Sequence, residues 1–229
     1  MNRLPFAALL CGLLFFLPSC SKTGNNIRNS VIIIGSSIAA GEGASSVEKS
    51  WAGRLAEDNK ADKFVNLSVG ASTTYNFLPL SYTDYCKNLN RPAPYTEASV
   101  SSVIAKRPDF VILSFTTNDV KNGFTPEEYL KNIQIITDSL EKAKIRYLVT
   151  SNILAGTFTQ KQKQDSKTIF LSLPVIYGQY YVDIMTPLVD TANMEINKSL
   201  FISDNTHPND DGHFNVFSKI NAAYKRLTN

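Results

Sequence analysis

Val31-Ile-Ile-Ile34-Gly35-Ser36-Ser37 is the stretch of this chain that indicates the fold most clearly. Four β-branched apolar residues in succession are typical of a short strand in the buried part of a sheet. The run stops at Gly35, followed by two serines, which suits a tight turn that exposes a hydroxyl group. Because sites in parallel α/β sheets form just beyond the carboxyl ends of strands, Ser37 is a candidate functional residue.

Around this stretch the chain alternates short apolar runs with longer segments of helical periodicity. The pattern implies an α/β fold with a mostly parallel sheet and helices on both faces. Residues 79–96 are rich in proline and tyrosine, show no periodicity, and are predicted to be a loop or insertion. Strands are predicted over 31–34, 64–67, 109–115, 145–149 and 180–184, and helices over 48–58, 97–106, 125–140, 161–173 and 211–227.

Local signals mark two helix ends. Thr125 and Glu128 have the spacing of a capping box, with Pro126 at the first helical position. Pro174 is expected to end the helix that begins near residue 161. The aromatic stretch from Tyr75 through Tyr95 has two interpretations, a wall on which sugars stack or a packed insertion.

Length and composition limit the classes of function. The 229 residues, 43% of them hydrophobic, are enough for one domain with a substantial core. The net charge of +3 is small and unclustered, which argues against nucleic acid as a partner. Cys86 is expected to be a buried, unpaired thiol once the other two cysteines are assigned to the N-terminal segment.

Residues 1–19 are predicted to be an export signal. Arg3 precedes an apolar run from Leu4 to Leu17 that is too short to span a bilayer comfortably. Leu17-Pro-Ser-Cys20 resembles the lipobox of bacterial lipoproteins, which implies lipidation of Cys20. Residues 20–30 then form a flexible tether and 31–229 the domain, anchored to a membrane of the bacterial cell envelope on its periplasmic or surface face. An ordinary secretory signal is the alternative.

Asp204-Asn-Thr-His207-Pro208, near the C-terminus, supplies a candidate acid and base. Histidine is the usual general base at neutral pH, and a carboxylate close by can fix its tautomer and orientation. With Ser37 as nucleophile, these residues suggest a serine hydrolase. The structural alternatives are a capping histidine and an Asx turn at Asp204.

The other histidine, His213, also follows an aspartate by three residues. It falls in the first turns of the last predicted helix, where Asp210 and Asp211 are expected to act as caps. We therefore expect a polar surface or capping role for His213.

Two further residues follow predicted strands and could donate hydrogen bonds to an oxyanion. The backbone N–H of Gly70 can approach a ligand closely, and the side-chain amide of Asn118 is a donor. Together with the N–H of Ser37 they would stabilise a developing negative charge. Asp119 is interpreted as structural support behind Asn118.

These short blocks, in this order, resemble the SGNH hydrolase superfamily, also called GDSL esterases. The matching blocks are Gly35-Ser36-Ser37, Gly70, Thr116-Thr117-Asn118-Asp119, and Asp204 with His207. The resemblance implies a three-layer, flavodoxin-like fold with five strands and no metal or organic cofactor. Two residues depart from the family pattern: Ser36 replaces an aspartate, and Thr116 replaces a glycine, where a Cβ would crowd the site or forbid a positive φ.

The expectation is therefore a lipid-anchored esterase that works through an acyl-enzyme on a small acyl ester. An O-acetylated carbohydrate is the favoured substrate. Two alternatives stay open, a surface lipoprotein that uses the fold as a binding module and an acyltransferase that uses the same residues.

Overall fold

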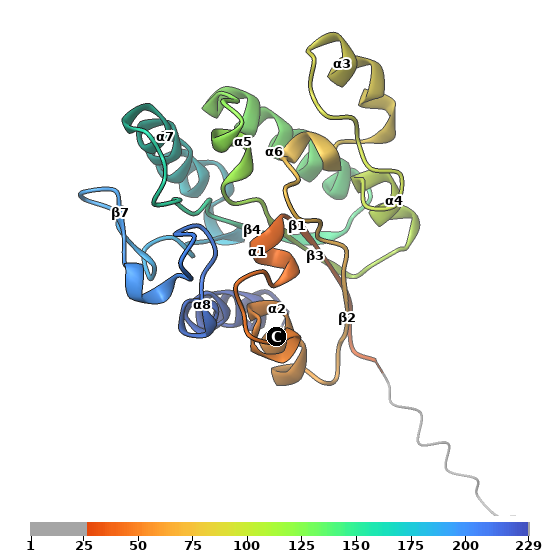
Figure 1. Cartoon of the computed structure of the whole chain (residues 1–229). Helices are drawn as coiled ribbons and strands as arrows, with labels where there is room; N and C mark the ends of the chain where they lie inside the picture. Colours follow the sequence, from red (N-terminus) through yellow and green to blue (C-terminus); the bar gives the residue numbers. More distant parts are fainter. Residues whose placement is uncertain (1–26, 229) are drawn as a thin grey trace, which may run out of the picture.

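A sheet of five parallel strands forms the centre of the computed structural model, which describes residues 27–228 (Figure 1). The strand order is β2-β1-β3-β4-β5, the doubly wound order of flavodoxin-like folds. The predicted fold class is therefore confirmed. The strands are β1 (Ser30–Gly35), β2 (Lys63–Asn66), β3 (Phe110–Ser114), β4 (Arg146–Thr150) and β5 (Tyr181–Val182).

The predicted strand 31–34 lies within β1, which pairs with β2 on one side and β3 on the other. Ile33 lies opposite Asn66 in β2 and opposite Ile112 in β3. Strands that are covered on both faces read as continuous apolar runs, which explains the four β-branched residues of β1. Because the three strands are parallel, the segments that follow them meet at one edge of the sheet.

Helices cover both faces of the sheet, which gives three layers (Figure 1). One face carries α2 (Trp51–Asp58) and α8 (Asp210–Thr228), which pack against each other. The other carries α4 (Val100–Ala105), α6 (Pro126–Lys142) and α7 (Gln160–Tyr177). The shorter elements are α1 (Ser37–Ala40), η1 (Val47–Lys49), η2 (Thr74–Phe77), η3 (Leu80–Tyr82), α3 (Thr83–Asn88), α5 (Asn118–Lys121), η4 (Gly178–Tyr180), β6 (Val189–Asp190), β7 (Glu195–Ile196) and η5 (Lys198–Leu200).

The predicted start of α6 is confirmed, and the predicted end of α7 is wrong. Thr125 and Glu128 form the capping box of α6. In contrast, α7 continues through Pro174 to Tyr177. The helix persists because Leu173 and Tyr177 bury its next turn, and that packing outweighs the loss of one backbone donor.

The predicted loop 79–96 contains η3 and α3, and β5 is shorter than the predicted strand 180–184. Only Cys86 is buried in α3, so this helix has no periodic apolar face that a sequence could reveal. The hairpin of β6 and β7 was not predicted, because strands of two residues carry no pattern.

The aromatic stretch is packed rather than open. Tyr75 is fully buried, stacks edge-on against Phe124, and donates a hydrogen bond to Glu128. Tyr95 packs edge-on against the buried Phe77. These residues contribute to the core, which supports the packed insertion and not the sugar-stacking wall.

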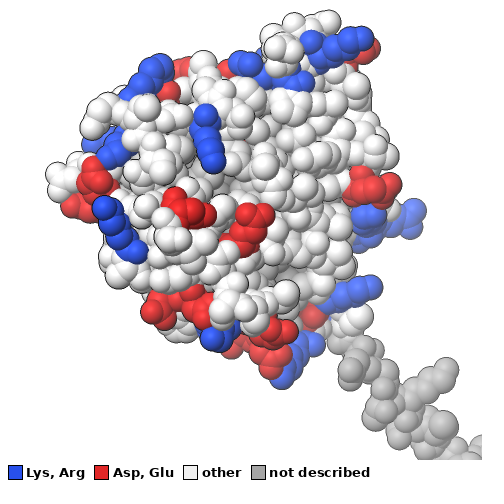
Figure 2. Space-filling view, viewed as in Figure 1, with Lys and Arg blue, Asp and Glu red and all other residues white. Residues whose placement is uncertain are grey.

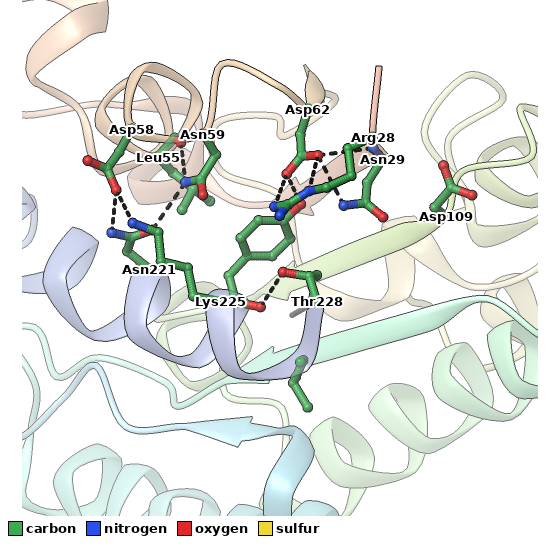
Figure 3. A network of polar contacts seen from close by, with 12 residues as sticks. Arg28, Asn29, Leu55, Asp58, Asn59, Asp62, Asp109, Asn221, Lys225 and Thr228 are labelled. Atoms are coloured by element: carbon green, nitrogen blue, oxygen red, sulfur yellow. Dashed lines mark hydrogen bonds and ion pairs between the residues drawn. The ribbon is translucent and has the colours of Figure 1, made fainter. Parts of the chain in front are cut away.

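The chain joins the fold at the amino ends of the strands, through a network centred on Asp62 (Figure 3). The buried Asp62 carboxylate accepts hydrogen bonds from the Arg28 guanidinium, from the backbone and side chain of Asn29, and from the Tyr224 hydroxyl. Burial opposes ionisation, but these donors outweigh it and lower the pKa of Asp62. Residues 28–30, predicted to be tether, are therefore part of the fold, and Ser30 begins β1.

We expect Asp62→Ala to lower the free energy of unfolding by about 2–4 kcal/mol, because the buried donors of Asn29 and Tyr224 lose their acceptor. Thermal and urea unfolding would measure the change. Asp58→Ala is the matched control. Asp58 bonds Lys225 and Asn221 in the same network, but its side chain is 43% exposed, so water can replace it. Equal losses in the two variants would contradict this account.

Candidate active site

Ser37 is the first residue of α1 and lies directly beyond the carboxyl end of β1. Gly35 is required there, because a Cβ at this position would come within 2.2 Å of the Ser114 carbonyl oxygen in β3. Ser36 has extended backbone and precedes the helix. Since the first N–H groups of a helix have no acceptor within it, the Ser37 N–H can serve a ligand.

His207 lies between Ser37 and Asp204, the two residues that the sequence analysis grouped with it. Its Nε2 is 2.8 Å from Ser37 Oγ, and its Nδ1 is 2.6 Å from Asp204 Oδ2. An ionised carboxylate only accepts, so Nδ1 donates to Asp204 and the Nε2 lone pair faces the serine hydroxyl. The arrangement is that of a nucleophile, a base and an orienting acid.

Asp204 makes an Asx turn and also contacts the imidazole of His207. Its Oδ1 accepts from the backbone N–H groups of Thr206 and His207, which makes an Asx turn, while Oδ2 accepts from the imidazole. Partial burial opposes ionisation of this carboxyl, but the donors of His207 and Thr206 outweigh it and lower the pKa of Asp204. The Asp204 carboxyl is therefore held ionised at neutral pH and in contact with His207 Nδ1.

The loop after α1 packs against the segment that carries His207. Gly43 has φ +96°, and a Cβ there would come within 2.2 Å of the Pro208 carbonyl oxygen. Asp210 accepts from the backbone and hydroxyl of Ser45 and from Lys49, which ties the same loop to the start of α8. Ser37 and His207, 170 residues apart in sequence, are thus held together by neighbouring turns.

The expectations for His213 and the caps of α8 were wrong. His213 is fully buried, accepts the Trp51 N–H at Nδ1, and donates from Nε2 to the Glu42 carbonyl oxygen. The side chain that accepts from the first turn of α8 belongs to Asn209, which bonds the N–H groups of Asp211 and Gly212. Amphipathic spacing could not reveal a histidine that satisfies two backbone groups inside the core.

Hydrogen bonds bring the loop of Gly70 to the end of β1. The Val69 N–H and the Ser72 hydroxyl both donate to the Gly35 carbonyl oxygen, at 3.0 and 3.1 Å. Asn118, at the start of α5, donates from Nδ2 to the Ser72 carbonyl oxygen at 2.9 Å. This bond uses one of the two amide hydrogens and leaves the other for a ligand.

The two departures from the family pattern are in contact with each other. Ser36 Oγ and Thr116 Oγ1 are 3.1 Å apart and form a buried hydrogen bond. Thr116 is not among the residues of the described chain that adopt a positive φ, so its Cβ creates no backbone strain. The two hydroxyls therefore satisfy each other in a buried position next to Ser37 in the chain.

Asp119 supports the site from behind, without any contact to His207. Its buried carboxylate accepts from the backbone N–H and the hydroxyl of Thr74, which ties α5 to η2. Burial raises the pKa of Asp119 to about 6, against its hydrogen bonds to Thr74.

This shift predicts a pH-dependent stability. A raised folded-state pKa means that the contribution of Asp119 is complete below about pH 4 and is lost as the pH rises through 6. Asp119→Asn cannot ionise, so its free energy of unfolding relative to wild type should rise by roughly 2 kcal/mol between pH 4 and 7. Urea unfolding of both proteins across this pH range measures the difference. Because the two proteins share all other titrating groups, the contributions of those groups cancel. Parallel profiles would contradict the shift.

Glu42 is a residue of the site that the sequence reasoning missed. Its Oε2 lies 3.3 Å from His207 Nε2, and its Oε1 lies 2.5 Å from the position that a Cβ on Gly70 would occupy. No pattern in the sequence marks Glu42, because its proximity to His207 arises only when residues far apart in the chain come together.

Neither a metal cluster nor a membrane span is found in residues 27–228. No group of three or more His, Cys, Asp and Glu side chains in this range is arranged to hold a metal ion. No helix in the same range is both long and apolar enough to cross a bilayer. Cys86 is a free, buried thiol. Acidic and basic side chains are interspersed over the face seen in Figure 2.

Comparison with known families identifies the class of protein. The profile of the GDSL-like lipase/acylhydrolase family matches residues 33–213, which is most of the chain and spans all the blocks named above. The chain therefore belongs to this family, and its resemblance to the SGNH hydrolases is confirmed. A comparison with curated proteins found no significant match.

Solved structures share the fold at low sequence identity. A GDSL-like lipase from Bacteroides thetaiotaomicron VPI-5482 has a TM-score of 0.64 and 19% identity, over 87% of this chain and 89% of that one. The psychrotrophic esterase EstA from Pseudoalteromonas sp. has a TM-score of 0.61 and 15% identity, over 87% and 98%. A two-domain esterase active on acetylated mannans has a TM-score of 0.57 and 18% identity, over 87% of this chain and 49% of that one.

Proposed function

We propose that this protein is a serine ester hydrolase that works through an acyl-enzyme. The observation that supports this most strongly is the continuous chain of contacts from Ser37 Oγ through the His207 ring to Asp204 Oδ2, at 2.8 and 2.6 Å. Family membership supports the same class of reaction. A binding module would have no need for a hydroxyl aligned with a histidine and a carboxylate.

In the proposed mechanism, Ser37 Oγ attacks the acyl carbonyl while His207 Nε2 takes its proton. Asp204 stabilises the imidazolium that forms. The negative charge on the former carbonyl oxygen is stabilised by the N–H groups of Ser37 and Gly70 and by the Asn118 amide. His207 then protonates the leaving alcohol, and water attacks the acyl-enzyme with His207 again as base.

Ser36 and Thr116, the two departures from the family pattern, do not disturb this arrangement. Ser36 and Thr116 are paired with each other, and neither interrupts the contact between Ser37 and His207. A protein without catalytic activity would have no need for Ser37, Asn118, Asp204 and His207 together at one edge of the sheet. We therefore favour the hydrolase; an acyltransferase would use the same residues with another acceptor in place of water.

For the substrate we propose a small acyl ester, an acetyl ester of a carbohydrate in particular. The structural neighbour active on acetylated mannans supports this choice, although this chain spans only about half the length of that esterase. Short acyl groups suit a site formed by turns at the edge of a sheet.

We also propose that the protein is exported and anchored through a lipid on Cys20, which lies outside the described residues. The chain joins the fold at the amino end of β1, and Ser37 lies beyond its carboxyl end. The site would therefore lie at the opposite end of β1 from the tether. Cys20→Ser should release the protein from membrane fractions, whereas retention in membranes would argue against the lipid.

Turnover of p-nitrophenyl acetate, butyrate and octanoate tests the proposed reaction. We expect the highest kcat/KM with acetate and a burst of nitrophenolate equal to the enzyme concentration wherever deacylation is slow. Absence of turnover on all three esters, in protein that is shown to be folded, would contradict a general esterase.

A further inference from the structure

Glu42 has a fixed backbone and a side chain that reaches over the reacting atoms. Its N–H donates to the Ser37 carbonyl oxygen at 3.0 Å, and its own carbonyl oxygen accepts from His213 Nε2 at 3.0 Å. Gly41 and Gly43, with φ of +102° and +96°, shape the turn on either side. The backbone of Glu42 is therefore fixed, and its half-exposed side chain places Oε2 3.3 Å from His207 Nε2.

His213 is a reliable anchor for this turn at neutral pH. Its Nδ1 accepts the Trp51 N–H, so its single proton must lie on Nε2, which donates to Glu42. Burial lowers the pKa of His213 and keeps the ring neutral, against the opposing effect of its bond to the Glu42 carbonyl. The His213 ring holds the backbone carbonyl of Glu42 and makes no hydrogen bond to its side-chain carboxylate.

The position of the Glu42 carboxylate is relevant to one step of the proposed reaction, the departure of the alcohol. His207 Nε2 is the atom that returns a proton to the leaving alcohol, and Glu42 Oε2 lies 3.3 Å from it. An alcohol bound where it can receive that proton therefore lies beside a negative charge. An ionised carboxylate accepts hydrogen bonds from hydroxyls and repels other anions.

We propose that Glu42 determines the leaving-group specificity of this site. It favours esters of neutral, polyhydroxylated alcohols, whose free hydroxyls donate to the carboxylate, and it disfavours alcohols that carry a phosphate or carboxylate. The proposal rests on the proposed esterase function and narrows its substrate class to carbohydrate-like alcohols. Glu42 is a specificity residue, and the bond-making atoms remain those of Ser37 and His207.

The test uses two acetate esters that differ by one charge, p-nitrophenyl acetate and its analogue with a carboxylate on the nitrophenol ring. Wild type should prefer the neutral ester, after correction for the spontaneous rates of the two compounds. In Glu42→Gln the ratio of kcat/KM values, neutral over anionic, should fall by about 5-fold, as expected for one partly solvated charge at close range. The effect should shrink with added salt.

Glu57→Gln is the matched control, because it removes the same charge from an exposed side chain whose partner is Lys60. Its ratio should equal that of wild type. A ratio that is unchanged in Glu42→Gln, with both esters turned over, would overturn this inference and leave the esterase intact. Failure of wild type to hydrolyse either ester would overturn the proposed function itself, and the inference with it.

Discussion

Ser37→Ala should reduce kcat/KM for p-nitrophenyl acetate by about 10⁴–10⁶, and the residual activity would come from the oxyanion donors and from binding. The loss is this large because the nucleophile, base and acid act as a unit, and removal of one of them disables the others. His207 and Asp204 would remain in place but would have no hydroxyl to activate. Steady-state rates at saturating and limiting ester separate the loss in kcat from any change in KM.

The same variant should remain folded, since Ser37 Oγ contacts only His207 among the side-chain contacts of the described residues. A melting temperature close to that of wild type would establish this. Ser68→Ala is the matched control, because it removes a hydroxyl from the loop after β2 that has no hydrogen-bond partner in residues 27–228. Comparable activity of Ser37→Ala and Ser68→Ala would rule out Ser37 as the nucleophile.

Asn118→Ala is expected to have the second largest effect, a fall in kcat of about 10²–10³. The amide hydrogen that does not bond Ser72 is available to an oxyanion, whose charge exists only in the transition state. The loss should therefore fall on kcat more than on KM. Kinetics with p-nitrophenyl acetate, together with thermal unfolding, measure both quantities.

Asn122→Ala controls for damage to this segment, because the exposed Asn122 amide donates to the Asn118 carbonyl oxygen directly after the same short helix, α5. Its activity should stay within about twofold of wild type, as for most exposed surface changes. If Asn118→Ala keeps near-normal kcat, the amide does not stabilise the oxyanion. If both variants lose activity and stability together, damage to α5 explains the loss, and the oxyanion role of the Asn118 amide is contradicted.

The sequence predicted those parts of the fold in which one physical signal dominates. The continuous apolar run of β1 is visible because the strand is buried on both faces, and the capping box of α6 is visible because it has a fixed spacing. The passage of α7 through Pro174 was not predictable, since burial of Tyr177 beyond it depends on tertiary packing.

In the candidate site, too, some residues could be predicted from local sequence signals and others depend on tertiary contacts. Ser37, Asp204 and His207 could be named because their chemistry needs particular residue types at recognisable positions, and the structure brings them together. Glu42 and His213 could not be placed, because their roles arise from a contact between a turn after β1 and a helix at the other end of the chain. The spacing of residues along the sequence does not reveal contacts between distant segments of the chain.

The most direct test of the central claim is covalent capture of the nucleophile. Wild type is incubated with an alkyl fluorophosphonate, whose phosphorus would be attacked by Ser37 Oγ with loss of fluoride, and is then analysed by intact mass and peptide mapping. We expect one adduct, located on Ser37, that is absent from Ser37→Ala and forms far more slowly in His207→Ala. No adduct on folded wild type, or an adduct on another residue, would contradict the account.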